Sequence, residues 1–351
     1  MGLSFEDVHH SFGGIPALCG VTLEAEKGEI LCLLGQSGSG KTTLLNLTAG
    51  VLRVQRGDIR LYGQSLASPS RHTLPEKRPI GLVFQEGALF PHMTVAQNIA
   101  FGVRIKKDRQ SIVGELLEQI GLVGFADRFP HTLSGGQQQR VAVARALAPE
   151  PAVLLMDEPF ASIDIMRRRR LREEIRRLLK ARGCITIFVT HDPEEAVETA
   201  DKIAVMESGR ISQHGTAESL YRSPRSLLVG LMAGEGSVVR GRRVGSTVET
   251  HFGKVELKQL ALQFSSEHTD EIDILLRPQS ITLGASENGA RIIDVRRTGR
   301  SQIVTLEAED KTVVLLHVAH LPEWHVGQAV SLGNSDQRLP AFSVQASSKM
   351  T

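Results

Sequence analysis

The first two-thirds of the chain alternates between unbroken apolar runs and segments with helical spacing of apolar residues. The run at 152–156 is unbroken, as in strands buried on both faces, and apolar or β-rich runs of the same kind lie at 29–34, 80–84 and 185–189. Segments with helical spacing lie between and after them, at 44–49, 95–103, 111–122, 141–147 and 193–199. Strands that alternate with helices predict an α/β domain built on a parallel sheet.

The pattern changes after the glycine-rich segment Gly230–Ser237, which predicts a linker. Beyond it helical spacing disappears. Short β-type runs separated by turn residues lie at 272–276, 280–283, 290–295, 302–306, 312–318 and 329–332. We therefore expect two domains: an α/β domain over 1–232, with a helical insert at about 88–150, and a small β-barrel over 237–340.

Length and composition fit this division and exclude some classes of protein. A chain of 351 residues with 41% hydrophobic and 23% charged residues is typical of a globular protein with about two domains. A formal net charge of +2 gives no argument for nucleic acid. We expect no signal peptide at Met1–Asp7 and no membrane span, so any membrane contact goes through partner proteins. The cysteines Cys19, Cys32 and Cys184 lack metal-ligand spacing, which fits a reducing cytoplasm.

The most informative chemistry lies in Gly35–Thr43, between the first buried strand and a helix. Its glycines let several backbone N–H groups point inward, and the first helical turn adds unpaired N–H groups and a positive dipole end. Lys41 can reach terminal phosphates, and the Thr42 hydroxyl can ligate Mg²⁺. This order of strand, glycine loop and helix predicts a phosphate-binding P-loop.

A second glycine motif, Leu133–Arg140, opens another helix. Ser134 is a plausible N-cap, and Gly135 and Gly136 follow it. This makes a second anion-binding helix start, although one nucleotide needs only one cradle. The second start therefore binds a different anion or meets the phosphates that another copy of the chain holds.

Polar residues follow three of the buried strands, where open α/β sheets bind ligands. Asp157 can hold Mg²⁺ through a water, and Glu158 can accept a proton from an attacking water. His191 can hydrogen-bond a γ-phosphate, although such a histidine can also simply cap the next helix. Gln85 closes another strand, where it is either solvated or in contact with Mg²⁺ or water.

Three further features allow two interpretations each. Phe12, beside Gly13 and Gly14, could stack on a nucleotide base or be an ordinary exposed hydrophobic residue. The basic stretch 167–182 could bind nucleic acid, but its glutamates and its apolar face favour a solvated helix. His317, His320 and His325 could form a metal site, although surface histidines are favoured.

These motifs, in this order, resemble the ATP-binding subunit of ATP-binding-cassette (ABC) importers. The resemblance rests on Gly35–Thr43, Gln85, Leu133–Gln137, Asp157-Glu158 and His191, and it covers residues 1 to about 230. It implies a P-loop NTPase (ABC ATPase) domain with a helical subdomain. The C-terminal part, with Leu276-Arg277-Pro278, resembles the accessory oligonucleotide-binding-like (TOBE) domain of such subunits.

The resemblance implies ATP and Mg²⁺ as cofactors and gives each residue a role. Phe12 stacks on adenine, Thr42, Gln85 and Asp157 contact Mg²⁺, and Glu158, His191 and Gln85 take part in hydrolysis. The remaining phosphate contacts come from Gly35, Ser37, Gly38, Ser39, Gly40, Lys41 and Thr43. The opposite subunit of a head-to-tail dimer closes on the ATP with Ser134, Gly135, Gly136, Gln137 and Asp164. Two positions depart from the family pattern: Ile163 replaces the usual leucine, and Pro193 replaces a common glutamine.

The partners implied are a second copy of the chain, integral-membrane permease subunits, and a periplasmic or lipid-anchored solute-binding protein. The expected location is the cytoplasmic face of the bacterial inner membrane, with no nucleic acid. Phe84–His92 and Gly234–Gly236 look most like ferric-ion importer subunits. Importers of polyamine, sulfate, phosphonate or sugar are alternatives, and so is a non-transport ABC ATPase that acts on nucleic acid. Lys41, Glu158 and His191 together argue against a regulator that uses ATP only as a switch.

Overall fold

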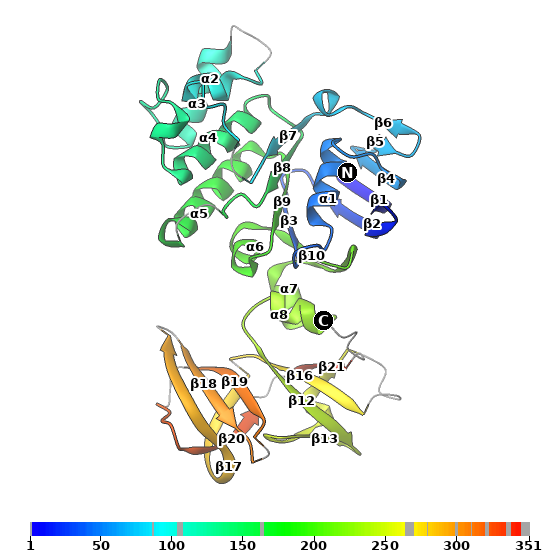
Figure 1. Cartoon of the computed structure of the whole chain (residues 1–351), viewed down its shortest axis with the longest axis vertical. Helices are drawn as coiled ribbons and strands as arrows, with labels where there is room; N and C mark the ends of the chain where they lie inside the picture. Colours follow the sequence, from blue (N-terminus) through cyan, green and yellow to red (C-terminus); the bar gives the residue numbers. More distant parts are fainter. Residues whose placement is uncertain are drawn as a thin grey trace. The chain divides into compact units, whose positions relative to one another are not determined.

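The computed structural model describes residues 2–85, 88–103, 108–161, 165–263, 270–278, 280–298, 301–309, 311–319, 323–334 and 338–344. Its contacts divide the chain into two compact units, 1–217 and 218–351, which are described separately (Figure 1). The division at residue 217 falls before residue 232, the predicted end of the first domain, because two short helices between these positions group with the second unit. The predicted boundaries stay predictions about independently folding domains.

The first unit is built on a six-stranded sheet with the order β11-β10-β3-β9-β8-β7. All neighbouring pairs are parallel except β10 and β11. Apolar side chains bury β3, β8 and β9 on both faces, as their unbroken hydrophobic runs predict. The strands are β3 (Ile30–Leu34), β7 (Ile80–Val83), β8 (Val153–Asp157), β9 (Ile185–Thr190), β10 (Lys202–Glu207) and β11 (Arg210–Gly215).

A second, antiparallel sheet of five strands shares an apolar core with this sheet and with α1 (Lys41–Ala49). Its order is β2-β1-β4-β5-β6. Figure 1 shows α1 and this sheet on one side of the central strands. The strands are β1 (Leu3–Phe12), β2 (Ile15–Ala25), β4 (Arg56–Leu61), β5 (Gln64–Ser68) and β6 (Arg71–His72).

The remaining helices of the first unit include the predicted helical insert. Figure 1 shows α4, α5 and α6 on the side of the central strands opposite α1. Their bounds, with those of the two smaller helices of the insert, are α2 (Val95–Ala100), α3 (Arg109–Gln119), α4 (Gly135–Leu147), α5 (Ile165–Arg182) and α6 (Pro193–Thr199).

The second unit begins with two helices, α7 (Ala217–Arg222) and α8 (Leu227–Met232), and its other described elements are strands apart from the 3₁₀ helix Leu257–Gln259. A six-stranded sheet, β14-β13-β12-β16-β21-β15, and a four-stranded sheet, β19-β18-β17-β20, share one apolar core. The strands are β12 (Ser237–Val244), β13 (Thr247–Thr250), β14 (Gly253–Glu256), β15 (Leu260–Leu262), β16 (Glu271–Leu276), β17 (Ile281–Thr298), β18 (Ser301–Glu307), β19 (Val313–Ala319), β20 (Ala329–Asn334) and β21 (Leu339–Ser343).

The second unit corrects one prediction and refines another. Gly230–Met232 is the last turn of α8 rather than linker, and only 233–236 separates that helix from β12. Gly230 is a packing position, because a Cβ there would lie 2.5 Å from Leu275 Cδ2. The all-β character is confirmed. The described strands pair as two open sheets instead of a single closed ring, and the runs at 280–283 and 290–295 belong to one strand, β17.

Candidate functional site

The predicted catalytic segments meet at one edge of the central sheet. Strands β3, β9, β8 and β7 are adjacent and parallel, so their carboxyl ends share that edge. Leu34 pairs with Thr190, and Asp157 pairs with Val189, which brings the ends of three strands level. The loops that leave these ends carry the P-loop, Gln85, Asp157-Glu158 and His191. Residues spread over more than 150 sequence positions therefore form one site.

Lys41 lies at the centre of the P-loop and is 6% exposed. Its Nζ donates to the carbonyl oxygens of Gly35 at 2.9 Å and Gln36 at 2.8 Å, and to Ser39 Oγ at 3.3 Å. Burial lowers the pKa of this ammonium, while Glu158 and Asp157 act in the opposite direction. The loop thus holds a cation in place at the start of α1, where helix N–H groups also favour an anion.

Two glycines and a distant turn support the loop. A Cβ on Gly35 would lie 2.4 Å from the Met206 carbonyl oxygen. Gly40 has φ +100°, and a Cβ there would lie 2.5 Å from the Ala17 carbonyl oxygen. In the turn between β10 and β11, Gly209 N–H donates to the Ser39 carbonyl at 3.1 Å. Nothing in the sequence marks this contact, since a serine-glycine turn between two strands indicates only a hairpin.

Asp157 ends β8 beside the P-loop helix and accepts a hydrogen bond from the Thr42 side chain. Burial raises the pKa of this carboxyl, and the neighbouring Glu158 carboxylate raises it further, while Lys41 and Thr42 lower it. A carboxylate held in these surroundings is stabilised by a further positive charge. Together with the Thr42 hydroxyl and the Gln85 amide, it supplies the hard oxygen ligands that suit Mg²⁺.

Glu158 contacts the other two predicted catalytic residues. Its Oε1 lies 3.1 Å from His191 Nδ1, and its Oε2 accepts from Gln85 Nε2 at 3.4 Å. The backbone of Glu158 has φ +41°, an uncommon value for a residue with a side chain, and its N–H donates to the Val189 carbonyl at 3.1 Å. Strained residues of this kind are concentrated at functional sites. The structure thus brings Gln85, Glu158 and His191 together.

The second glycine motif starts α4, as predicted. Ser134 is the N-cap and forms a capping box with Gln137: Ser134 N–H donates to Gln137 Oε1 at 2.9 Å, and Gln137 N–H donates to Ser134 Oγ at 3.4 Å. Ser134 and Gly135 are exposed, and Gly136 is partly exposed. Figure 1 shows α4 and α1 on opposite sides of the central strands. The helices that follow the two anion cradles therefore lie on different sides of the central sheet.

Phe12 ends β1 at the tip of the hairpin with β2 and is 50% exposed. Its ring makes an edge contact with buried His10, with ring centroids 4.7 Å apart. Ala17 of β2 touches the P-loop at Gly40, so this hairpin borders the nucleotide site. The exposed ring leaves an aromatic face available there.

The basic helix α5 forms ion pairs with acidic residues of the first unit. Four of its arginines and Lys180 pair with acidic residues on α6 or just outside its ends, and Arg172 is 3% exposed. The pairs are Arg168 with Asp192, Arg169 with Glu198, Arg172 with Glu198, and both Arg176 and Lys180 with Asp201. This arrangement favours the structural interpretation of the basic stretch over nucleic-acid binding.

Some predicted site residues and one pocket stand apart. Asp164 and His320 lie outside the described residues, and no cluster of metal-binding side chains occurs in the part of the chain that the structure describes.

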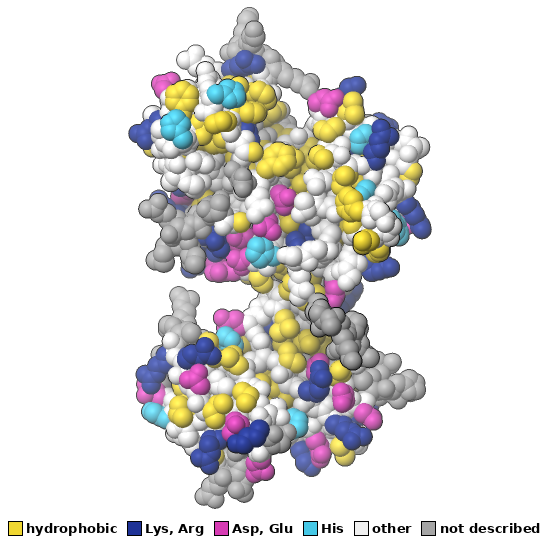
Figure 2. Space-filling model, viewed as in Figure 1, with side chains coloured by type: hydrophobic (Ala, Val, Ile, Leu, Met, Phe, Trp, Pro, Cys, Tyr) yellow, Lys and Arg dark blue, Asp and Glu magenta, His cyan; other side chains and the backbone are white. Residues whose placement is uncertain are grey.

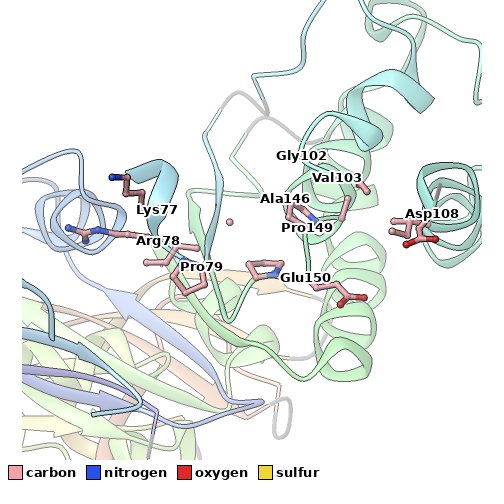
Figure 3. Close-up of a pocket in the computed structure, with 14 residues that line it drawn as sticks. Lys77, Arg78, Pro79, Gly102, Val103, Asp108, Ala146, Pro149 and Glu150 are labelled. Atoms are coloured by element: carbon pink, nitrogen blue, oxygen red, sulfur yellow. The ribbon is translucent and has the colours of Figure 1, made fainter. Parts of the chain in front are cut away.

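A pocket of about 590 Å³ lies between the start of β7 and the end of α4. Figure 3 shows Pro79 and Ala146 at this pocket, which contains none of the predicted nucleotide-binding residues.

The fold and the arrangement at the sheet edge define a P-loop ATPase of the ABC type, and the predicted fold class is confirmed. The ABC transporter family profile matches residues 18–161. The chain belongs to this family and is the ATP-binding subunit of an ABC importer. No helix among the described residues has the length and apolar character to cross a bilayer.

Similar proteins match over most of the chain. The sulfate/thiosulfate import ATP-binding protein CysA of Thermosynechococcus vestitus is 42% identical over 91% of this chain and 91% of its own length. The Fe(3+) ions import ATP-binding protein FbpC of Pseudomonas fluorescens is 42% identical over 81% of this chain and 79% of its own.

Solved structures match about three-fifths of the chain. CbiO1 from Clostridium perfringens, part of an ABC transporter complex, has a TM-score of 0.58 at 30% identity, covering 63% of this chain and 90% of its own. The dimeric ATP-binding cassette MJ0796, bound to ADP and Pi, has a TM-score of 0.52 at 28% identity, covering 61% and 98%.

Proposed function

We propose that two copies of this chain, arranged head to tail, hydrolyse Mg²⁺-bound ATP between them and drive solute uptake through a separate permease. The observation that carries the proposal is the convergence of the P-loop, Gln85, Asp157-Glu158 and His191 at one edge of the central sheet. Each of these segments supplies a different requirement of phosphoryl transfer: phosphate binding, metal ligation and water activation.

In this proposal the P-loop exchanges internal contacts for phosphate contacts. Lys41 donates to carbonyls of its own loop, and the same ammonium binds the terminal phosphates of ATP when the nucleotide enters. Thr42, Gln85 and Asp157 hold Mg²⁺, which neutralises part of the phosphate charge. The Thr42 side chain donates a hydrogen bond to Asp157, which brings two of these oxygen donors together and supports this assignment. Phe12 stacks on the adenine.

Glu158 accepts the proton of the attacking water, and His191 contacts the γ-phosphate. Both Glu158 oxygens already have partners that orient them, His191 on one side and Gln85 on the other. An oriented carboxylate at a strand end, next to the phosphate cradle, meets the geometric requirement for a general base. Hydrolysis then depends on a water placed between Glu158 and the terminal phosphate.

The second copy completes each site. Ser134, Gly135, Gly136 and Gln137 form a helix start with exposed or partly exposed residues, and its helix α4 lies on the far side of the central strands from α1. Such a helix start binds anions, and it reaches an ATP only when it is the ATP of another copy. We propose that Asp164 acts at the same interface. The similar cassette MJ0796 is dimeric in its state bound to ADP and Pi, which supports a dimer of this chain.

A mixing experiment tests the shared site. Lys41→Ala disables the P-loop half, and Ser134→Arg blocks the helix-start half, so each variant alone should lose ATPase activity. A mixed dimer has one site with both halves intact. Random pairing should then restore about a quarter of the wild-type rate per chain, because half of the dimers are mixed and each has one good site. A mixture as inactive as its components would contradict the head-to-tail site.

We place the permease contact on the surface around the loop 88–94. Buried Asn98 fixes this loop: its Nδ2 donates to the Phe90 and Met93 carbonyls at 3.1 Å, and its Oδ1 accepts from Phe90 N–H at 2.9 Å. The Phe90 ring packs against Phe101, which is 58% exposed. Figure 2 shows hydrophobic side chains gathered over this part of the first unit. A rigid, exposed apolar surface suits the apolar face of a helix from a membrane partner.

The names of the relatives favour an inorganic oxyanion as the solute. Several similar proteins, including those of Thermosynechococcus vestitus and Chromobacterium violaceum, are named for sulfate/thiosulfate import, and one is named for Fe(3+) ions. We therefore propose sulfate or thiosulfate, with ferric ion as the second candidate because of the resemblance in Phe84–His92 and Gly234–Gly236. Deleting the gene and measuring uptake of labelled sulfate and labelled iron distinguishes the two candidates. The deletion should lower uptake of the transported solute and leave uptake of the other unchanged.

A further inference from the structure

A buried carboxylate lies just behind His191 and has no role in the chemistry described so far. Glu195, on α6, is 3% exposed. Its Oε2 accepts a hydrogen bond of 2.6 Å from Thr190 Oγ1, and Thr190 is the last residue of β9, directly before His191. Burying a carboxylate is costly unless it is well partnered, and here burial raises the pKa of Glu195. A carboxylate buried at this cost is expected to have a structural or functional role.

The Thr190 hydroxyl joins both sides of His191. It donates to Glu195, and it also accepts a hydrogen bond of 3.0 Å from the N–H of Asp192. Asp192 then caps α6 by accepting from Glu194 N–H at 2.9 Å. The Thr190 hydroxyl therefore links the residues on either side of His191. The Glu195 carboxylate fixes the orientation of this hydroxyl by accepting its hydrogen bond. Thr190 is 1% exposed, so water does not compete for this hydroxyl.

Helix α5 fixes the carboxylate from the other side. Arg168 Nη1 lies 4.0 Å from Glu195 and 3.7 Å from Asp192. The next turn of α5 presents buried Arg172, which pairs with the neighbouring carboxylates of α6: Glu198 at 2.8 Å and Glu194 at 3.6 Å. Glu195 thus lies between Arg168 of α5 and Thr190 of β9. Its only contact with the turn that carries His191 among those described here is the hydrogen bond from Thr190.

We propose that Glu195 is a positioning residue for ATP hydrolysis, which holds His191 against Glu158 through the Thr190 hydroxyl. The inference rests on the proposed role of His191. His191 itself is exposed, so its direction depends on the turn and on its 3.1 Å contact with Glu158 Oε1. A fixed turn keeps this side chain ready for the γ-phosphate, because catalytic groups lose most of their effect when they are displaced by about 1 Å.

The test measures steady-state ATPase activity of the full chain at varied Mg²⁺-ATP. Thr190→Val removes the hydroxyl at nearly constant volume, and Thr190→Ser restores it. The matched control is Glu194→Gln, a neighbouring glutamate on the same helix whose side chain is 70% exposed. We expect Thr190→Val to lower kcat about tenfold with KM changed less than twofold, because the lost contact acts in the transition state. Thr190→Ser and Glu194→Gln should retain the wild-type kcat.

A double-mutant cycle with His191→Ala separates positioning from general structural support. If Glu195 acts through His191, then Thr190→Val should lower kcat by less than about twofold further in the His191→Ala background. Should Thr190→Val not fold, Glu195→Gln, which keeps an oxygen acceptor, and Glu195→Met, which removes it, carry the same comparison. Wild-type kcat in Thr190→Val, or a full additional loss in the His191→Ala background, would overturn the inference. Wild-type activity of His191→Ala would instead overturn the proposed function.

Discussion

The proposed general base gives the sharpest prediction, through the substitution Glu158→Gln. The amide keeps the length and shape of the side chain but no longer accepts a proton. In the wild type, the two carboxylate oxygens meet His191 Nδ1 at 3.1 Å and Gln85 Nε2 at 3.4 Å. A glutamine can keep both contacts, with its oxygen toward Gln85 and its amide N–H toward an unprotonated Nδ1. The site should therefore retain its shape and lose only its base.

These contacts allow an estimate of magnitude. Loss of a positioned general base lowers a rate by about 10²–10⁴-fold. At about 1.36 kcal/mol per factor of ten, the activation barrier should rise by about 2.7–5.4 kcal/mol. The free energy of unfolding should change by less than about 1.5 kcal/mol, because at most one hydrogen bond is weakened. ATP affinity should stay within about threefold of the wild type, since Lys41 and the P-loop N–H groups are untouched.

Three measurements on the same protein check this: steady-state ATPase rate, ATP affinity by calorimetry, and the dimer fraction with Mg²⁺-ATP by size-exclusion chromatography. We expect slow turnover, near-normal affinity and an accumulated ATP-bound dimer. Glu150→Gln is the matched control, because it removes the same charge from an exposed residue before the other end of β8. Wild-type turnover by the Glu158 variant would refute its assignment as the base.

The other predictions concern phosphate binding, pH dependence and the second unit. Lys41→Ala should weaken ATP binding at least about tenfold by calorimetry, since one charge-assisted hydrogen bond contributes about 1.5–3 kcal/mol, whereas exposed Lys27→Ala should bind normally; equal affinities would count against the P-loop role. Asp157→Asn should raise the melting temperature in the absence of Mg²⁺, because the folded-state pKa of Asp157 is raised and its ionised form therefore opposes folding. This gain should be absent below the ordinary pKa of 3.8 and should grow as the pH rises through the raised value, and a gain that shrinks with rising pH would contradict it. Arg277→Met should destabilise the second unit by about 3 kcal/mol in thermal unfolding, because it removes hydrogen bonds to the carbonyls of Gly230, Gly234 and Glu235; an unchanged transition would show that these carbonyls find other partners. A folded 1–236 fragment should still bind ATP, and complete loss of binding would show that the predicted domain division is misplaced.

The sequence predicted the central sheet well because its strands are buried on both faces. The run 152–156 has no polar position that would suit a helix with one solvated side, 185–189 has only Thr186 among β-branched and aromatic residues, and both are strands. Strands at the surface carried a weaker signal. β13 and β14 have mixed exposure and lack a hydrophobic run, and the sequence analysis did not identify them.

The contacts that support the site were beyond sequence reasoning, because they join residues far apart in the chain. The bond from Gly209 to Ser39 and the link from Glu195 to His191 through Thr190 involve residue types that are common at turns and on helix surfaces. Only the packing shows that Glu195 is buried. The prediction that Gly230 begins a linker was wrong. Glycine suggests a break in regular structure, but in α8 this glycine allows close contact with Leu275.

The position of β3 has a consequence for the order in which the protein can form. Both neighbours of this strand, β9 and β10, come more than 150 residues later in the chain, and the turn that bonds Ser39 follows β10. A growing polypeptide therefore carries its P-loop out of the ribosome long before the strands that flank it exist. The complete set of contacts around the P-loop, including the bond from Gly209, can therefore form only after Gly209 has been synthesised.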